Sequence, residues 1–201
     1  YFTVPPFHFI DEDGKPFTDK DIAGKVLIVD FFFTRCTSIC PRMSAQMHQL
    51  QLQLDDPAYK DVLFLSHTVD PEHDTPAVLK AYAKRLEADP KRWKFLTGNA
   101  PDIYRQGNLG YLLSADKDSS AAEQFVHSPQ FVLVVAGRSG PEVELSGTGD
   151  LRMRGDDLLD EGRSRSHHAR DKNRPPRIAG TIRRAREALL RHGWPGNVRE
   201  L

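Results

Sequence analysis

The run Asp30-Phe31-Phe32-Phe33-Thr34-Arg35-Cys36-Thr37-Ser38-Ile39-Cys40-Pro41 contains the only two cysteines of the chain. The start of this run overlaps the apolar residues 26–33, whose aromatic and β-branched side chains predict a strand buried on both faces. Pro41 is typical of the first turn of a helix, so the cysteines lie at a strand-to-helix junction. Two cysteines four positions apart can direct both sulfurs at one point, because positions i and i+4 share a helix face. The helix N-terminus favours thiolate, the form that binds soft metals or attacks disulfides.

A third candidate residue, His127, lies far downstream, just before Ser128-Pro129-Gln130 and the apolar run 131–135. If the fold brings this histidine beside the cysteines, it completes a set of two sulfurs and one nitrogen. Such a set suits copper, because thiolates select Cu(I) and imidazole also accepts Cu(II). Zinc uses the same residue types but needs a fourth ligand or an open water position. A histidine packed near a strand end, without any metal, is the alternative interpretation of His127.

Four motifs in this order carry a family resemblance. They are Thr-Arg-Cys-Thr-Ser-Ile-Cys-Pro at 34–41, Val-Asp-Pro-Glu-His-Asp-Thr-Pro at 69–76, Phe-Leu-Thr-Gly at 95–98, and His-Ser at 127–128 before a strand. Over about residues 4–135 the chain resembles the Sco/SenC family of thioredoxin-like copper proteins. The resemblance implies an α/β thioredoxin-like fold with a central mixed sheet flanked by helices, over residues 4–145. It also implies copper, as Cu(I) or Cu(II), held by Cys36, Cys40 and His127.

The same resemblance implies a function and a location. Family members deliver copper to the copper site of cytochrome c oxidase, or reduce the cysteines of that site. The implied partners are therefore the copper-site subunit of the oxidase and other copper chaperones or thiol reductants, and no nucleic acid is expected. Family members are usually tethered to a membrane, and this chain begins at Tyr1 and contains no apolar stretch of the roughly 18 residues that a spanning helix needs. We therefore expect a periplasmic or outward-facing domain, anchored through a segment absent from this chain.

A thiol–disulfide oxidoreductase without metal remains an alternative, in which Cys36 and Cys40 are a catalytic pair that cycles between dithiol and disulfide. Thioredoxins proper have two residues between their cysteines, whereas this chain has three. The common peroxiredoxin motif has a threonine three residues before the reactive cysteine and a proline four before that. Phe33 and Val29 occupy those places here, which argues against a peroxiredoxin.

Hydrophobic patterning predicts the remaining elements. A hairpin is expected over 7–18, helices after Pro41 and from Thr75, a strand over 62–66, and a short helix over 102–109. Strands are expected over 131–135 and 143–145, with Pro129 as the candidate for a cis proline. Strands that alternate with helices indicate a sheet covered on both faces.

Several other polar residues allow two interpretations. Asp70 and Asp74 are either groups near the metal or ordinary turn and helix-start residues. Arg35 either lies at the solvated rim or lowers the pKa of Cys36. Met43 and Met47 are assigned to core packing because they lie on the apolar stripe of their helix. The histidines without site context are interpreted as surface or cap residues: His8, His48, His67 and His73.

The last third of the chain departs from the family pattern. The formal net charge of the chain is zero, yet residues 163–191 contain ten Lys or Arg and two Asp or Glu. We expect residues 146–201 to be a basic tail that is disordered or foreign to the domain. Residues 188–201 resemble a lid segment of NtrC-type AAA+ regulators, which indicates a bacterial source. The chain has no G-x-x-x-x-G-K-[ST] phosphate loop, so an ATPase is excluded, and a DNA-associated regulator fragment is the remote alternative.

Overall fold

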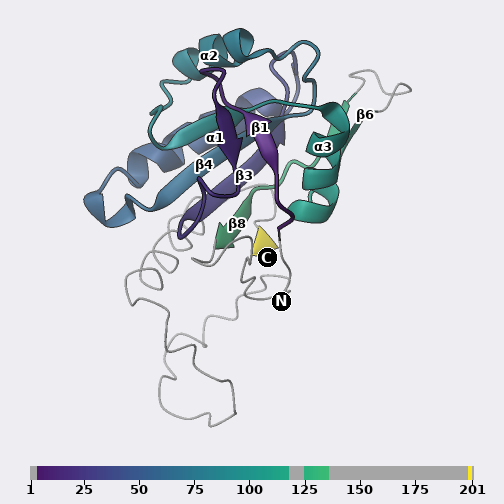
Figure 1. Cartoon of the computed structure of the whole chain (residues 1–201). Helices are drawn as coiled ribbons and strands as arrows, with labels where there is room; N and C mark the ends of the chain where they lie inside the picture. The colour runs from purple at the N-terminus through teal and green to yellow at the C-terminus, as the bar shows by residue number, and fades with distance from the viewer. Residues whose placement is uncertain (1–3, 118–124, 136–198, 201) are drawn as a thin grey trace, which may run out of the picture.

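The computed structural model describes residues 4–117, 125–135 and 199–200, and its central feature is a five-stranded sheet in the order β5-β4-β3-β8-β9 (Figure 1). Strands β3 (Val26–Phe32), β4 (Val62–Thr68) and β5 (Trp93–Leu96) run parallel to one another. Strand β8 (Val132–Val135) pairs antiparallel to β3, which makes the sheet mixed. The predicted strands at 26–33, 62–66 and 131–135 are thus present.

Two helices connect the three parallel strands. Helix α1 (Cys40–Gln53) follows β3, and helix α2 (Pro76–Arg85) follows β4. Both begin with a proline in the first turn, where its missing N–H costs no hydrogen bond. Thr75 caps α2, because its side chain accepts from the N–H of Val78. The short 3-10 helix η1 (Pro57–Tyr59) lies between α1 and β4.

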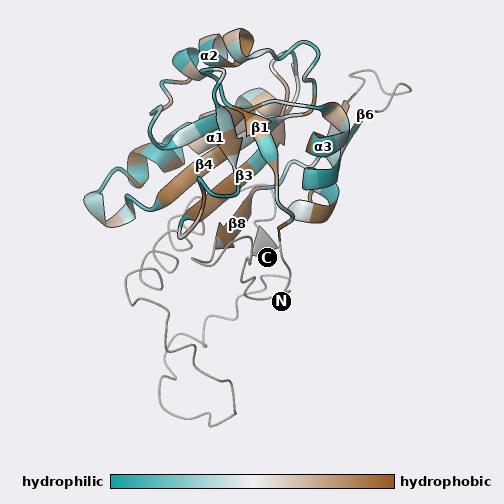
Figure 2. Ribbon diagram, in the orientation of Figure 1, coloured by the Kyte–Doolittle hydropathy of each residue, from teal (hydrophilic) through white to brown (hydrophobic). Residues whose placement is uncertain are grey.

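The core lies on both faces of this sheet. Successive residues of a strand point to opposite faces, so Phe31 and Phe32 serve different layers. Phe32 stacks on Tyr82 of α2, while Phe31 packs near Tyr111 and stacks on His67. Figure 2 shows the strongest hydrophobic colouring on β3, β4 and β8, which agrees with strands covered on both sides.

The remaining elements, apart from the central sheet and helices α1 and α2, are short. Strands β1 (His8–Ile10) and β2 (Pro16–Thr18) form the predicted hairpin, and Gly14 in its turn adopts the left-handed φ of 77° that glycine tolerates best. The helix expected at 102–109 appears as α3 (Ala100–Arg105), continued by the π-helical turn η2 (Gln106–Gly110). Strands β6 (Ala115–Lys117) and β7 (Phe125–His127) form a separate two-stranded ribbon.

Two expectations are wrong. No cis peptide bond occurs among the described residues, so the bond between Ser128 and Pro129 is trans. His67 is not a surface or cap residue, because its side chain is fully buried between the rings of Phe9 and Phe31. Its neutral ring packs as an aromatic side chain, and burial lowers its pKa to about 3.

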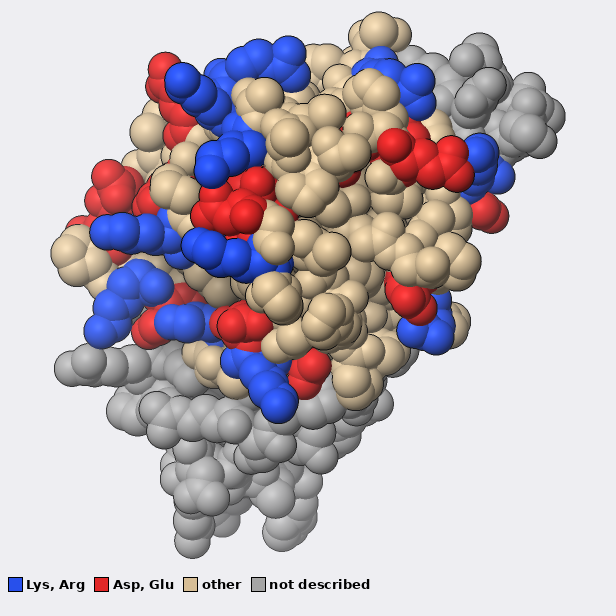
Figure 3. All heavy atoms as spheres, turned by 45° about the horizontal axis from the view of Figure 1, so that its top comes forward, with Lys and Arg blue, Asp and Glu red and all other residues tan. Residues whose placement is uncertain are grey.

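The C-terminal end contributes strand β9 (Arg199–Glu200), which pairs parallel to β8. The strand expected at 143–145 and most of the basic tail lie outside the described residues, so the boundary near residue 145 stays a prediction. Among the described residues, no helix has the length and apolar character needed to cross a membrane. Acidic and basic side chains are interspersed on the face that Figure 3 shows. The ion pairs of the described residues include Lys80–Asp13 and Lys94–Glu12.

Candidate metal centre

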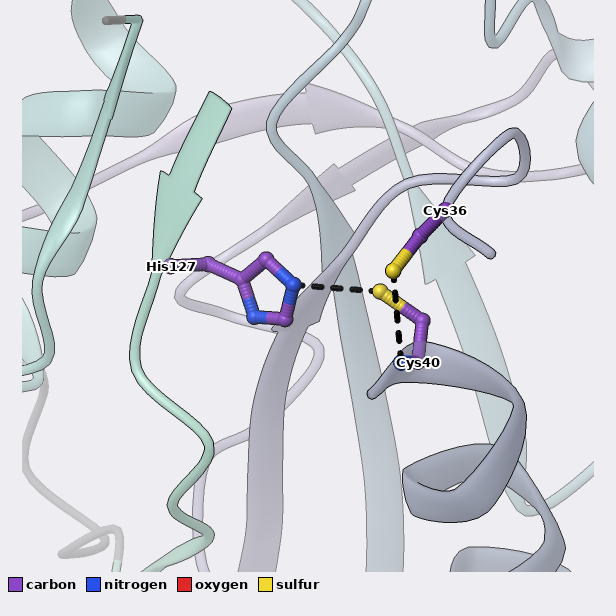
Figure 4. A group of neighbouring side chains, drawn as sticks. All are labelled: Cys36, Cys40 and His127. Atoms are coloured by element: carbon purple, nitrogen blue, oxygen red, sulfur yellow. Dashed lines mark hydrogen bonds between the residues drawn. The ribbon is translucent and has the colours of Figure 1, made fainter. Parts of the chain in front are cut away.

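Both cysteines lie at the junction between β3 and α1. Cys36 closes a turn in which its N–H donates to the carbonyl of Phe33 at 3.2 Å. Cys40 is the first residue of α1, and its N–H donates to Sγ of Cys36 at 3.4 Å. The first N–H groups of a helix lack intrahelical partners, so this amide is available to a sulfur. The sequence therefore places the two sulfurs side by side, as the four-residue spacing predicts (Figure 4).

His127 reaches the same point from the end of β7. Its Nε2 atom lies 3.1 Å from Sγ of Cys40, and its Nδ1 atom lies 3.2 Å from the carbonyl oxygen of Ser128. A carbonyl can only accept, so this hydrogen bond places the ring proton on Nδ1 and directs the Nε2 lone pair at the sulfur. The ring of Phe33 packs edge-to-face against the imidazole of His127, with centroids 5.9 Å apart, and this contact further restricts the orientation of the imidazole.

The three side chains fit one soft metal ion. Sγ of Cys36, Sγ of Cys40 and Nε2 or Nδ1 of His127 all lie within 4.8 Å of one another. Sulfur and nitrogen ligands typically bind a metal at about 2.0 to 2.3 Å, so two ligands of one ion stand at most about 4.6 Å apart. Both cysteines are buried, no disulfide joins them, and His127 is half-buried. The arrangement can hold a metal or, as an alternative, close a disulfide.

The two thiols differ in acidity. Burial alone would raise the pKa of Cys36, but hydrogen bonds from Cys40 and Ser38 outweigh it and lower that pKa below its usual value. Burial raises the pKa of Cys40, and its hydrogen bond with Cys36 and the nearby carboxyl of Asp30 raise it further. Cys36 is also 7% exposed against 1% for Cys40. Cys36 is therefore the sulfur that ionises first.

Asp70 and Asp74 lie beside the residues that precede Cys36. The guanidinium of Arg35 donates to Oδ2 of Asp70 through Nε at 3.1 Å and through Nη2. Asp74 accepts from the backbone N–H of Thr34 at 3.0 Å and also from its hydroxyl. Both carboxylates thus hold the cysteine turn, while Asp70 also closes the local turn by accepting from the N–H of Asp74 through its backbone carbonyl.

Asp70, His73 and Asp74 form a second group of close potential ligands. Both oxygens of Asp74 already accept from hydroxyl or N–H donors, and Oδ2 of Asp70 accepts from Arg35. These donors give the carboxylates a structural role, so we do not count this group as a metal centre.

Sequence patterns missed some contacts of the site. Ser38, whose hydroxyl lies 3.6 Å from Sγ of Cys36, stood in the quoted run without an assigned role. Phe33 was assigned only to a buried strand, although its ring faces His127. Asp30 was the one sequence signal that could have indicated further polar contacts near the site, because an acidic residue inside an apolar strand is unusual. Met43 and Met47 are buried on the inner face of α1, in agreement with core packing.

The fold and the site together describe a thioredoxin-like protein in which two cysteines and a histidine converge beside a mixed sheet. The family model described as SCO1/SenC matches residues 2–141. The chain therefore belongs to the SCO1/SenC family, and the thioredoxin-like fold expected from the sequence is confirmed.

Solved structures of family members are similar to this chain. A SCO1/SenC family lipoprotein from Bacillus anthracis shares 35% identity with a TM-score of 0.62, covering 71% of this chain and 83% of its own. BsSco, described as having a disulfide switch and belonging to a family of cytochrome c oxidase assembly proteins, shares 32% identity with a TM-score of 0.59, covering 71% and 81%. Bradyrhizobium japonicum ScoI with copper bound shares 26% identity with a TM-score of 0.56, covering 70% and 85%.

The short resemblance of residues 188–201 to AAA+ regulators has no support from these comparisons. The family model ends at residue 141, well before that segment. Of that segment, only residues 199 and 200 lie within the described part of the chain.

Proposed function

We propose that this chain binds one copper ion through Cys36, Cys40 and His127 and serves the assembly of the copper site of cytochrome c oxidase. The observation that carries the proposal is the convergence of two sulfurs and one imidazole nitrogen within 4.8 Å. The copper-bound structure of a relative and the oxidase-assembly description of another support it.

Copper fits this ligand set better than zinc does. A structural zinc site has four protein ligands, and the described residues supply three at this point. Two thiolates favour Cu(I), and the imidazole makes Cu(II) acceptable, so the site can carry copper in either oxidation state. Because the metal is cargo, a three-ligand site also leaves room for a ligand from a receiving protein.

A thiol–disulfide role is the second candidate function, and the unequal acidity of the cysteines favours it. Cys36 as thiolate is suited to attack a disulfide of a partner protein, and Cys40 is placed to release the resulting mixed disulfide. The pair Cys36 and Cys40 would then act catalytically, by reducing the cysteines of the oxidase copper site before or during copper transfer.

The partners, location and domain limits follow from the same proposal. We propose that the copper-site subunit of cytochrome c oxidase and other copper chaperones or thiol reductants are the partners. The lipoprotein relative supports a membrane-anchored domain on the outer side of a bacterial membrane, in the periplasm where the cell has one. Residues 4–145 would form the copper-binding domain, with 146–201 as a separate basic segment.

Copper titration of the reduced protein under anaerobic conditions tests the proposal. A sulfur-to-copper charge-transfer band that saturates at one equivalent is expected, together with copper retention through gel filtration. A protein with a purely redox role would cycle between dithiol and disulfide without any stoichiometric band. Zinc added in excess should not displace the copper, because Cu binds such ligands more tightly in the usual order of affinities.

A further inference from the structure

The turn that carries Cys36 is hydrogen-bonded to the loop between β4 and α2. In this turn, Phe33 and Cys36 are joined by a backbone hydrogen bond, and Thr34 and Arg35 are the two central residues. Both central residues bond to carboxylates of the loop: Thr34 to Asp74 and Arg35 to Asp70. The position of Cys36 is therefore set by a neighbouring segment as well as by its own.

Asp74 is the centre of this contact. Its side chain is fully buried, and it accepts from the backbone N–H and hydroxyl of Thr34 and from the hydroxyl of Thr68 at the end of β4. Nδ1 of His73 lies 2.9 Å from the same carboxylate. A buried carboxylate is stable only when such donors surround it, so these contacts form one rigid unit. The unit joins the sheet, the start of α2 and the Cys36 turn.

The two states of the cysteine pair need different sulfur spacings. A disulfide requires an Sγ–Sγ distance of about 2.05 Å, with Cβ atoms about 3.8 Å apart. Two thiolates that share one ion stand farther apart, because each is about 2.3 Å from the metal. Cys40 is fixed in helix α1, so the spacing depends on how freely the Cys36 turn can move toward it. A turn anchored through Thr34 resists that movement.

We propose that Asp74 is a positioning residue that, through Thr34, holds Cys36 at the spacing for metal binding and disfavours closure of the Cys36–Cys40 disulfide. The inference rests on the proposed function, in which the same sulfurs bind copper and form a disulfide. In the closure, the two thiols lose two protons and two electrons as the Sγ–Sγ bond forms. A small-molecule disulfide takes up the two protons and two electrons, and its own S–S bond breaks to give two thiols.

Thr34→Val is the sharpest test, because it keeps the shape of the side chain and removes one donor to Asp74. Asp74→Asn removes the charge, and Thr34→Ser restores the hydroxyl as the conservative variant. Asp21→Asn is the matched control, because Asp21 accepts from the N–H and hydroxyl of Thr18 in the same manner, away from the cysteines. The measurements are the Cys36–Cys40 reduction potential in glutathione redox buffers and the copper affinity of the full chain.

In Thr34→Val and Asp74→Asn, the equilibrium constant for disulfide formation should rise about tenfold, which is a reduction potential about 30 mV more negative. Copper affinity should fall about 10- to 100-fold, the usual effect of losing a group that orients a metal ligand. Thr34→Ser and Asp21→Asn should stay within about twofold of the wild type. If Asp74→Asn fails to fold, Thr34→Val decides alone.

An unchanged potential in a folded Thr34→Val variant would overturn the inference, as would an equal shift in Asp21→Asn. The reduction potential also separates this inference from the proposed function. A wild-type chain that binds no copper, with the potential still shifted in Thr34→Val, refutes the copper function and keeps the role of Asp74 in disulfide closure. Normal copper binding in the wild type, with no change in Thr34→Val, refutes only the role of Asp74.

Discussion

Nε2 of His127 lies 3.1 Å from Sγ of Cys40, although the two residues stand 87 positions apart in the chain. The cysteine pair is a local feature of the junction between β3 and α1, whereas the histidine ends β7, just before β8, which pairs with β3 over a long range in the sequence. Assembly of the three-residue site therefore depends on completion of the sheet. A partly folded chain would possess the dithiol without the imidazole.

Substitution of the three candidate ligands should weaken copper binding unequally. Cys36→Ser and Cys40→Ser each remove a soft ligand, so copper affinity should fall and the charge-transfer band should weaken, because only one thiolate remains. His127→Ala leaves the dithiolate and should lower copper affinity by at least about tenfold, or 1.4 kcal/mol. Copper titration followed by absorbance is the measurement, with His8→Ala as a control because His8 is exposed. An unchanged titration of His127→Ala would remove the histidine from the site.

Alkylation should occur first at Cys36. Hydrogen bonds lower the pKa of Cys36 and so increase its thiolate fraction. Burial raises the pKa of Cys40 and so decreases its thiolate fraction. Below the pKa, each unit of difference changes the thiolate fraction about tenfold, so we expect Cys36 to react at least tenfold faster with iodoacetamide. Peptide mapping by mass spectrometry at several times measures this ratio. Equal labelling of both cysteines in the native protein would contradict the assignment, and equal labelling is the expected result in denaturant.

Oxidation should release the metal. Copper binding needs both sulfurs as thiolates, so disulfide formation and metal binding compete for the same atoms. Native mass spectrometry of the protein before and after oxidation by glutathione disulfide should show loss of copper together with loss of two hydrogen masses. Full copper retention by the oxidised protein would show that the disulfide and the metal site use different atoms.

The stability of the reduced protein should fall as the pH rises from about 4 to 7. Burial raises the pKa of Asp30 from 3.8 to about 7, so in this range the folded state holds a proton that the unfolded state has released. The fold loses the corresponding free energy as pH increases, in total of the order of 4 kcal/mol. Asp30→Asn has no charge to desolvate and can still accept from Ser66 through its carbonyl, so its pH dependence should be flatter. Urea unfolding at several pH values tests this, and parallel curves for both proteins would contradict it.

A chain ended after Gly147 should still bind one copper ion. Cys36, Cys40 and His127 all lie before that point, and residues 149–176 contain few large apolar side chains to offset about 1 to 2 kcal/mol of backbone entropy per residue. Limited proteolysis of the full chain should leave a resistant core that ends near residue 145. Protection that extends to Trp194, or loss of copper binding on truncation, would mean that the pairing of β9 with β8 supports the site.

The sequence predicted the local parts of this molecule better than the long-range ones. The spacing of Cys36 and Cys40 after an apolar strand was enough to predict adjacent sulfurs, although Cys36 lies in the turn before α1 and not on a shared helix face. His127 was named through its motif, yet its strand β7 is three residues long and too short for a periodic pattern. The bond between Asp74 and Thr34 spans 40 positions, and no local signal distinguishes it from ordinary helix-start chemistry.

The histidine stands on the two-stranded ribbon of β6 and β7, while both cysteines belong to the central framework of β3 and α1. The ligands thus come from two different sheets of the fold. A metal bound by all three ligands would therefore act as a cross-link that joins the ribbon to the central sheet.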